Sequence, residues 1–163
     1  MLLISDANVL IDMIEGELID AMFSLDYKFS VPNTLYAEEL EAYYPELPAQ
    51  GLSILSVNPN GIAEAYTVAT SLSGARAPGV NDLLALMLAK QHSCPLVTGD
   101  KRLRSIATTN YSAVEIRGTI WLVEQLVTEG HITVTQAEEA FHKMIEAGSR
   151  LPKGEITKLL SRL

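Results

Sequence analysis

The sequence predicts a three-layer α/β/α domain with a short-stranded parallel sheet, followed by C-terminal helices. Short apolar runs alternate with longer segments whose apolar residues recur at helical spacing, and this alternation is typical of a parallel sheet covered on both faces. Hydrophobic residues make up 48% of the 163 residues, which is enough for a compact core. We expect residues 1–130 to form the main domain and residues 131–163 a helical extension packed on it or on a partner.

The expected elements follow one another in a β-α order along the chain. The short apolar runs predict strands at 2–5, 28–31, 96–98 and 113–116, with 53–57 either a strand or an extended link. Helical spacing and caps predict two short helices within 8–25, then helices at 33–44, 62–72, 81–92, 101–108, 119–129, 135–147 and 154–163. The 81–92 segment is apolar nearly all round, so we expect that helix to be buried.

The net charge of −8 is concentrated at the start of the chain, where residues 1–50 carry ten acids and one base. An acidic protein is a poor general binder of nucleic acid, so these acids either form a solvated surface or converge on a cation. The single Cys94 excludes a disulfide framework and a cysteine-based zinc site. No apolar run is long enough for a membrane span, and no basic segment precedes the first one, so we expect a cytoplasmic protein.

Four carboxylates are placed where the parallel strands end. Asp6 and Asp100 follow short strands, Asp82 lies in the first turn of the buried helix, and Glu38 lies one turn into the helix after the second strand. Ligands bind at the carboxyl ends of such strands. Four converging acids would repel one another unless they bound a divalent cation, and oxygen ligands suit Mg²⁺ or Mn²⁺. Such an ion can activate water for phosphodiester hydrolysis.

Each acid taken singly also has a purely structural explanation. Asp6 can cap the following helix, Asp82 gains from the helix dipole, and Asp100 can be a turn residue. Glu38 can be an exposed helix acid like its neighbours. The hypothesis of a metal site therefore depends on all four acids lying at one end of the same sheet.

The four segments that carry these acids, in this order, resemble the PIN-domain nucleases, and the likeness is good across residues 1–130. The segments are Ile4-Ser5-Asp6-Ala7-Asn8, the run from Val31-Pro32 to Glu38-Glu39-Leu40, Asn81-Asp82-Leu83-Leu84-Ala85-Leu86, and Leu96-Val97-Thr98-Gly99-Asp100-Lys101. The sequence is also similar to VapC-type toxins of bacterial toxin–antitoxin pairs. The helices after Arg117 resemble those of a PIN subgroup with a longer C-terminal tail.

The resemblance implies a metal-dependent ribonuclease that uses Mg²⁺ or Mn²⁺. It implies that the catalytic and metal-binding residues are Asp6, Glu38, Asp82 and Asp100. Asn8 and Thr98 would orient these acids. RNA would be the substrate, an antitoxin protein a partner, and a homodimer the assembly. Glu39 competes with Glu38, because neighbours on an α-helix differ by about 100° and only one can point inward. Glu38 keeps the family spacing from Pro32 and is preferred.

Several basic residues could hold the flanking phosphates of RNA, although a solvated helix face explains them equally well. They are Arg76, Lys101, Arg102, Arg104 and Arg117. Trp121 falls in an apolar helix, so we expect it in the core and see no aromatic stacking platform. His92, His131 and His142 fall at helix ends and surfaces, and we expect none of them to be catalytic.

Other classes of protein fit the pattern less well. A receiver domain of phosphotransfer signalling needs paired acids after its first strand and a separate acceptor aspartate near mid-chain. An Asp-x-Asp phosphohydrolase needs an acid where Asn8 stands, and a dinucleotide-binding fold needs a glycine-rich turn after the first strand. The remaining alternative is a catalytically degenerate PIN domain that binds RNA or protein without cutting.

Overall fold

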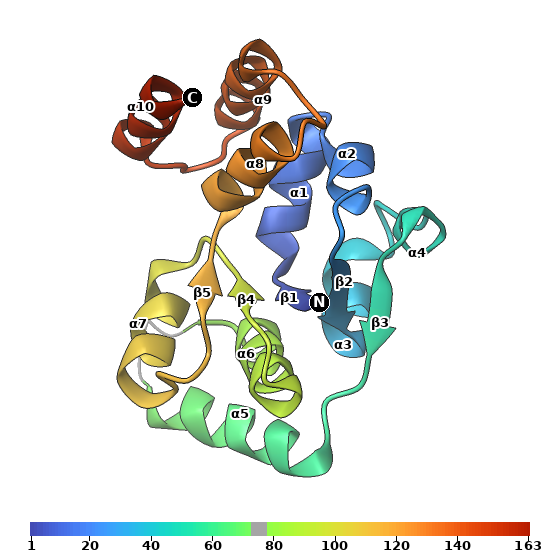
Figure 1. The fold of residues 1–163 in the computed structure, drawn as a ribbon. Helices are drawn as coiled ribbons and strands as arrows, with labels where there is room; N and C mark the ends of the chain where they lie inside the picture. Colours follow the sequence, from blue (N-terminus) through green and yellow to red (C-terminus); the bar gives the residue numbers. More distant parts are fainter. Residues whose placement is uncertain (73–77) are drawn as a thin grey trace.

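The computed structural model describes residues 1–72 and 78–163, and within them five parallel strands form one sheet in the order β3-β2-β1-β4-β5 (Figure 1). The strands are β1 (Leu2–Ser5), β2 (Lys28–Pro32), β3 (Ser53–Leu55), β4 (Leu96–Val97) and β5 (Ile116–Arg117). The expected α/β fold class is confirmed. The 53–57 segment is a strand at one edge, and the strand expected at 113–116 is a shorter one that begins at Ile116.

The central strand β1 sets the position of the first aspartate. Its residues Leu3 and Ile4 are fully buried, and Ile4 lies opposite Ser30 of β2 and Leu96 of β4. Pairing continues past the strand ends, because the amide of Asp6 donates to the Val97 carbonyl at 3.1 Å. The carboxyl ends of β1 and β4 therefore lie side by side, and the residues that follow them face the same space.

Helices lie on both sides of the sheet (Figure 1). One group is α5 (Pro59–Ser71), α6 (Val80–His92) and α7 (Lys101–Asn110), and the other is α1 (Ala7–Glu15), α2 (Ile19–Phe23), α8 (Thr119–Thr128), α9 (Val134–Glu146) and α10 (Lys153–Arg162). Helix α6 packs against β1, β2 and β4, and every residue from Leu83 to Ala89 is buried. The sequence-based expectation of a buried helix is confirmed.

The segment after β2 differs from the single helix expected at 33–44. A three-residue helix, α3 (Asn33–Leu35), leads into a π-helix, η1 (Tyr36–Leu40), in which the Glu41 amide donates to the Tyr36 carbonyl at 2.8 Å. A further short helix, α4 (Leu47–Gln50), lies where the sequence pattern predicted no helix. Proline is tolerated in the first turn of a helix, and Pro48 occupies that turn.

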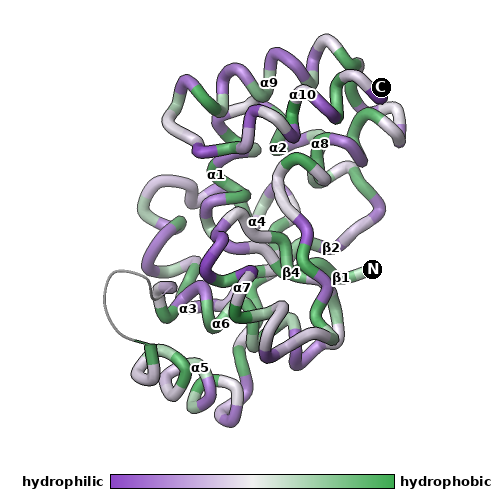
Figure 2. Tube along the Cα trace, turned by 90° about the vertical axis from the view of Figure 1, so that its left-hand side faces the viewer, coloured by the Kyte–Doolittle hydropathy of each residue, from purple (hydrophilic) through white to green (hydrophobic). Residues whose placement is uncertain are grey.

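The C-terminal helices share the core of the rest of the chain. Thr133 and Gln136 form a reciprocal capping box that starts α9. Helix α9 contacts α1 and α8, and α10 contacts α8 and α9, with Phe141 and Leu159 buried. Figure 2 shows α9 and α10 side by side at the end of the molecule opposite α5. None of the helices in 1–72 and 78–163 is long and apolar enough to cross a membrane.

Candidate metal centre

Asp6 is buried directly after β1, with 1% of its surface exposed. It caps α1, since its Oδ1 accepts from the Val9 amide at 2.9 Å, and its Oδ2 accepts from the Thr98 hydroxyl at 2.5 Å. Burial raises the pKa of Asp6 to about 6 in spite of these hydrogen bonds, which act in the opposite direction. Asp6 therefore does cap α1, but its hydrogen bonds only partly offset the cost of burying its negative charge.

Asp100 follows β4 and caps α7. Its Oδ1 accepts from the amides of Arg102 at 2.8 Å and Leu103 at 3.1 Å, and its Oδ2 lies 3.2 Å from the Arg102 guanidinium. Burial acts to raise the pKa of this carboxyl, but the hydrogen bonds and charge of Arg102 and the Leu103 amide outweigh it, so the pKa is lowered. Asp100 is therefore charged and held in one place.

Thr98 connects these two aspartates. Its fully buried hydroxyl donates to Asp6 and accepts from the Asp100 amide at 3.1 Å. Thr98 is thus placed where a residue that orients the acids should be. Asn8 is exposed in the first turn of α1, and within the described residues no hydrogen bond joins its side chain to an acid.

Asp82 is half-buried at the start of α6. Burial is the largest cause of a pKa raised to about 7, and the charges of Asp6, Glu39 and Asp100 raise it further. Only charges that lie near one another act in this way, so the structure brings these acids together. The lowering effect of Arg102 does not balance them.

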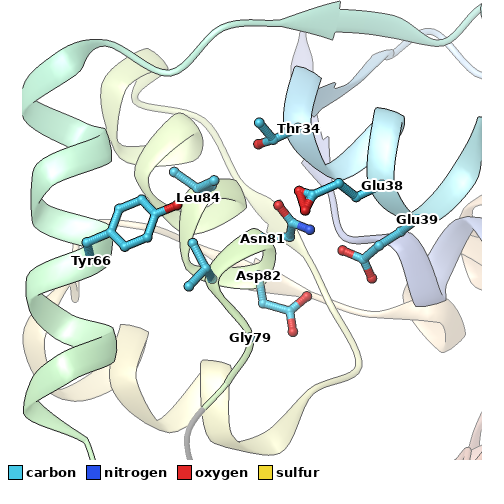
Figure 3. Close-up of a pocket in the computed structure, with 9 residues that line it drawn as sticks. Thr34, Glu38, Glu39, Tyr66, Gly79, Asn81, Asp82 and Leu84 are labelled. Atoms are coloured by element: carbon cyan, nitrogen blue, oxygen red, sulfur yellow. The ribbon is translucent and has the colours of Figure 1, made fainter.

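Glu38 and Glu39 lie next to each other on η1, and both line a cavity of about 480 Å³ that Asp82 also borders (Figure 3). We expected only one of the two to point inward, but both line the cavity on this π-helical turn. Of the two, Glu39 is the acid whose charge raises the pKa of Asp82. The remaining lining residues are Thr34, Tyr66, Gly79, Val80, Asn81 and Leu84.

Of the basic residues, Arg102 lies within this site, because its guanidinium pairs with Asp100 at 3.2 Å. Lys101, Arg102 and Arg104 are exposed on α7, whereas Arg117 pairs with Glu115 at 3.3 Å and lies over the Trp121 ring at 5.6 Å. Arg76 lies outside the described residues. Trp121 is half-buried, with its ring 5.8 Å from that of Tyr27.

The three histidines lie on the surface. His92 is the last residue of α6 and His131 follows α8, and both are exposed. His142 lies beside Glu146 of α9 at 3.0 Å.

The donor chemistry fits a hard divalent cation. Asp6, Asp82, Asp100 and Glu39 offer only carboxylate oxygens, and the pKa of Asp82 is raised first by burial and then by the negative charges of the other three. Within residues 1–72 and 78–163, no three His, Cys, Asp or Glu side chains lie close enough together to hold one ion by themselves. Mg²⁺ characteristically binds through one or two carboxylates and completes its coordination with water and substrate oxygens.

The parallel sheet, with aspartates directly after its central strands β1 and β4, is the PIN-like α/β architecture that the sequence predicts. The family model described as "DUF3368: PIN domain" matches residues 2–163, including the C-terminal helices, and the chain belongs to this PIN-domain family. PIN domains are generally nucleases that act on RNA and usually use divalent metals. No curated protein matches the chain.

Proposed function

We propose that this protein is a divalent-metal-dependent ribonuclease that hydrolyses RNA phosphodiesters with Mg²⁺ or Mn²⁺. The observation that carries the proposal is the position of Asp82, which borders an open cavity together with Glu38 and Glu39 and lies close enough to Asp6 and Asp100 for their charges to act on it. Acids that repel one another at a substrate-sized cavity are typical of a functional site rather than of a structural network.

Asp6 and Asp100 would hold one ion, and Asp82 with Glu39 or Glu38 would hold a second. Thr98 would fix the first pair, because its hydroxyl joins the Asp6 carboxylate to the Asp100 backbone. When bound, the metal supplies a water of lowered pKa and positive charge for the leaving oxygen. The protein supplies the orientation of the carboxylates and a fold that keeps them together in spite of their repulsion.

The basic residues give RNA a second means of attachment. Lys101 and Arg104 are exposed on α7, directly after Asp100, where they can reach phosphates on either side of the cleaved bond. Arg102 would act mainly on Asp100, with which it is paired. Arg117 and Arg76 remain proposed phosphate contacts, and Asn8 a proposed orienting residue.

The test is RNA cleavage in Mg²⁺ or Mn²⁺ against EDTA, with the wild type and Asp6→Asn compared. We expect metal-dependent cleavage that Asp6→Asn abolishes while circular dichroism shows the fold intact. Full activity of Asp6→Asn, or cleavage that persists in EDTA, would contradict the proposed metal-dependent mechanism. Metal-independent RNA binding without cleavage would instead favour a degenerate PIN domain that serves as a binding module.

The similarity to VapC-type toxins leads us to propose a cellular role as well. In this role the ribonuclease is the toxin of a toxin–antitoxin pair, acts as a homodimer, and is neutralised by an antitoxin protein. Expression of the chain should arrest growth, and co-expression of a neighbouring small open reading frame should restore it. Growth arrest that is unchanged in Asp6→Asn would argue against a toxin that acts by cleavage.

A further inference from the structure

The cavity beside Asp82 has two walls of different chemistry. Figure 3 shows Glu38 and Glu39 on the η1 side, and Tyr66 of α5 on the opposite side with Leu84 of α6 next to it. One wall is therefore acidic, and the other is aromatic and aliphatic. A ligand that fills the space must present a cation or a metal-bound phosphate to the first wall and an uncharged group to the second.

Tyr66 stands apart from the other tyrosines of the chain. It is 54% exposed, and it makes no ring contact and no hydrogen bond with any other residue of 1–72 and 78–163. The remaining tyrosines are all engaged: Tyr27 with Phe29 and Trp121, Tyr36 with the carbonyls of Tyr44 and Pro45, Tyr43 with Tyr44, and Tyr111 with Lys90. The ring of Tyr66 is thus available to a ligand in the cavity.

We propose that Tyr66 forms a nucleobase subsite, in which its ring stacks on the base of a nucleotide whose phosphate lies at the carboxylates. Aromatic stacking suits any base, because every base has a π-face. The hydroxyl of Thr34 and the amide of Asn81 line the same cavity and can hydrogen-bond to base edges. This inference rests on the proposed ribonuclease function and deepens it.

The subsite defines the class of RNA that the enzyme takes. A cavity of about 480 Å³ falls within the range of small-ligand pockets and has room for one splayed nucleotide. A base can enter it only when it is unpaired, because bases in an A-form helix are stacked on their neighbours and paired across the duplex. The base that occupies this subsite is therefore an unpaired one.

The experiment compares Tyr66→Ala, Tyr66→Phe and Tyr66→Trp with Tyr43→Ala. Tyr43 is a matched control, since it is 80% exposed and does not line the cavity. Binding of a labelled single-stranded oligonucleotide is measured by fluorescence anisotropy in the cleavage-silent Asp6→Asn background with Mg²⁺, and KM is measured without that substitution. Tyr66→Ala should weaken binding roughly 5- to 100-fold, whereas the Phe and Trp variants and Tyr43→Ala should stay within about threefold of wild type.

A series of oligonucleotides with one abasic nucleotide moved along the strand gives the sharper test. The wild type should lose affinity when one particular base is missing, and Tyr66→Ala should be indifferent to that base, because the two losses remove the same contact. Additive losses, or binding by Tyr66→Ala equal to that of Tyr43→Ala, would overturn the subsite alone.

Two further outcomes are also decisive. If Tyr66→Ala binds RNA normally but changes the elution volume of the protein, Tyr66 is a protein contact and the subsite proposal fails. If the wild type neither binds nor cleaves any RNA with Mg²⁺ or Mn²⁺, the proposed function fails, and the subsite with it.

Discussion

The β4–α7 turn and the N-terminus of α6 both carry an aspartate, but the surroundings stabilise the negative charge of the first and destabilise that of the second. Asp100 accepts hydrogen bonds from two backbone amides and from Arg102, and its pKa is lowered. Asp82 accepts no hydrogen bond from the described residues, and burial and three neighbouring acids raise its pKa to about 7. Two aspartates at the same end of the sheet therefore differ. Protein groups stabilise the negative charge of Asp100, whereas burial and neighbouring acids destabilise that of Asp82.

This difference leads us to expect different roles for the two carboxylates. The charge of Asp100 is stabilised by protein groups whether or not a cation is present. The charge of Asp82 is disfavoured by burial and by the nearby acids more than Arg102 favours it, so a divalent ion would supply the missing positive charge. We therefore expect Asp100 to have both a structural and a catalytic role, and Asp82 to be catalytic at some expense to stability.

The largest expected effect separates these two roles. Asp82→Asn and Asp100→Ala should each reduce cleavage roughly 10²- to 10⁴-fold, because each removes a proposed metal ligand. In EDTA at pH 8, Asp100→Ala should be destabilised by about 0.5–2 kcal/mol through loss of the α7 cap. Asp82→Asn should melt at or above the wild-type temperature, and equal destabilisation of both variants would contradict the comparison.

Thr98 gives an effect of intermediate size. Thr98→Val should weaken Mg²⁺ binding about 10- to 100-fold, because the hydroxyl that orients Asp6 and Asp100 is lost. Thr98→Ser should retain most of the affinity for Mg²⁺. This affinity is measured as the Mg²⁺ concentration that gives half-maximal cleavage. Thr119→Val is a matched control, since its buried hydroxyl donates to Asp12 at 2.9 Å, and it should lower stability without changing the Mg²⁺ requirement.

The adjacent glutamates of η1 give a smaller effect. Glu39→Gln should raise the Mg²⁺ concentration needed for half-maximal cleavage by about fivefold, because it removes one charge that acts on Asp82. Glu38→Gln is the matched control and should have less effect. If Glu38→Gln instead has the larger effect on the Mg²⁺ requirement, Glu38 is the glutamate that acts at the metal site, as the spacing from Pro32 predicts.

The smallest effect is the pH dependence of stability without metal. The folded-state pKa values of Asp82 (about 7) and Asp6 (about 6) lie above the ordinary value of 3.8, so the folded protein binds more protons than the unfolded chain. The contribution of these two groups to the free energy of unfolding is therefore lost as pH rises from about 4 to about 7, and in EDTA the melting temperature should fall by a few degrees over this range. The lowered pKa of Asp100 acts in the opposite direction, but only in more acidic solution.

Thermal melts in EDTA at pH 5.5 and 8 check this expectation. Asp82→Asn should flatten the pH dependence, and Mg²⁺ should stabilise the wild type more at pH 8 than at pH 5.5. A pH dependence that is the same in Asp82→Asn and in the wild type would show that other groups cause it.

The parts of the site that the sequence predicts are those fixed by strand ends. Asp6 and Asp100 could be placed together because parallel strands end at one edge of a sheet, and the buried α6 places Asp82 near them. The geometry of η1 could not be predicted, since the spacing of buried residues such as Tyr36 and Leu40 is compatible with either an α or a π turn. Tyr66 was missed for a related reason, because only the packing of α5 on α6 brings its ring to the cavity.

The π turn of η1 also bears on how this chain is compared with its relatives. A π turn closes each hydrogen bond over one residue more than an α turn does, so it amounts to a single-residue insertion that the helix absorbs without breaking. A family member with a regular helix here would carry the glutamate equivalent to Glu39 one position nearer to its proline. An alignment without a gap between Pro32 and Leu40 would then pair that glutamate with Glu38, so it would show a matching acid but would match the wrong one of the two neighbouring glutamates.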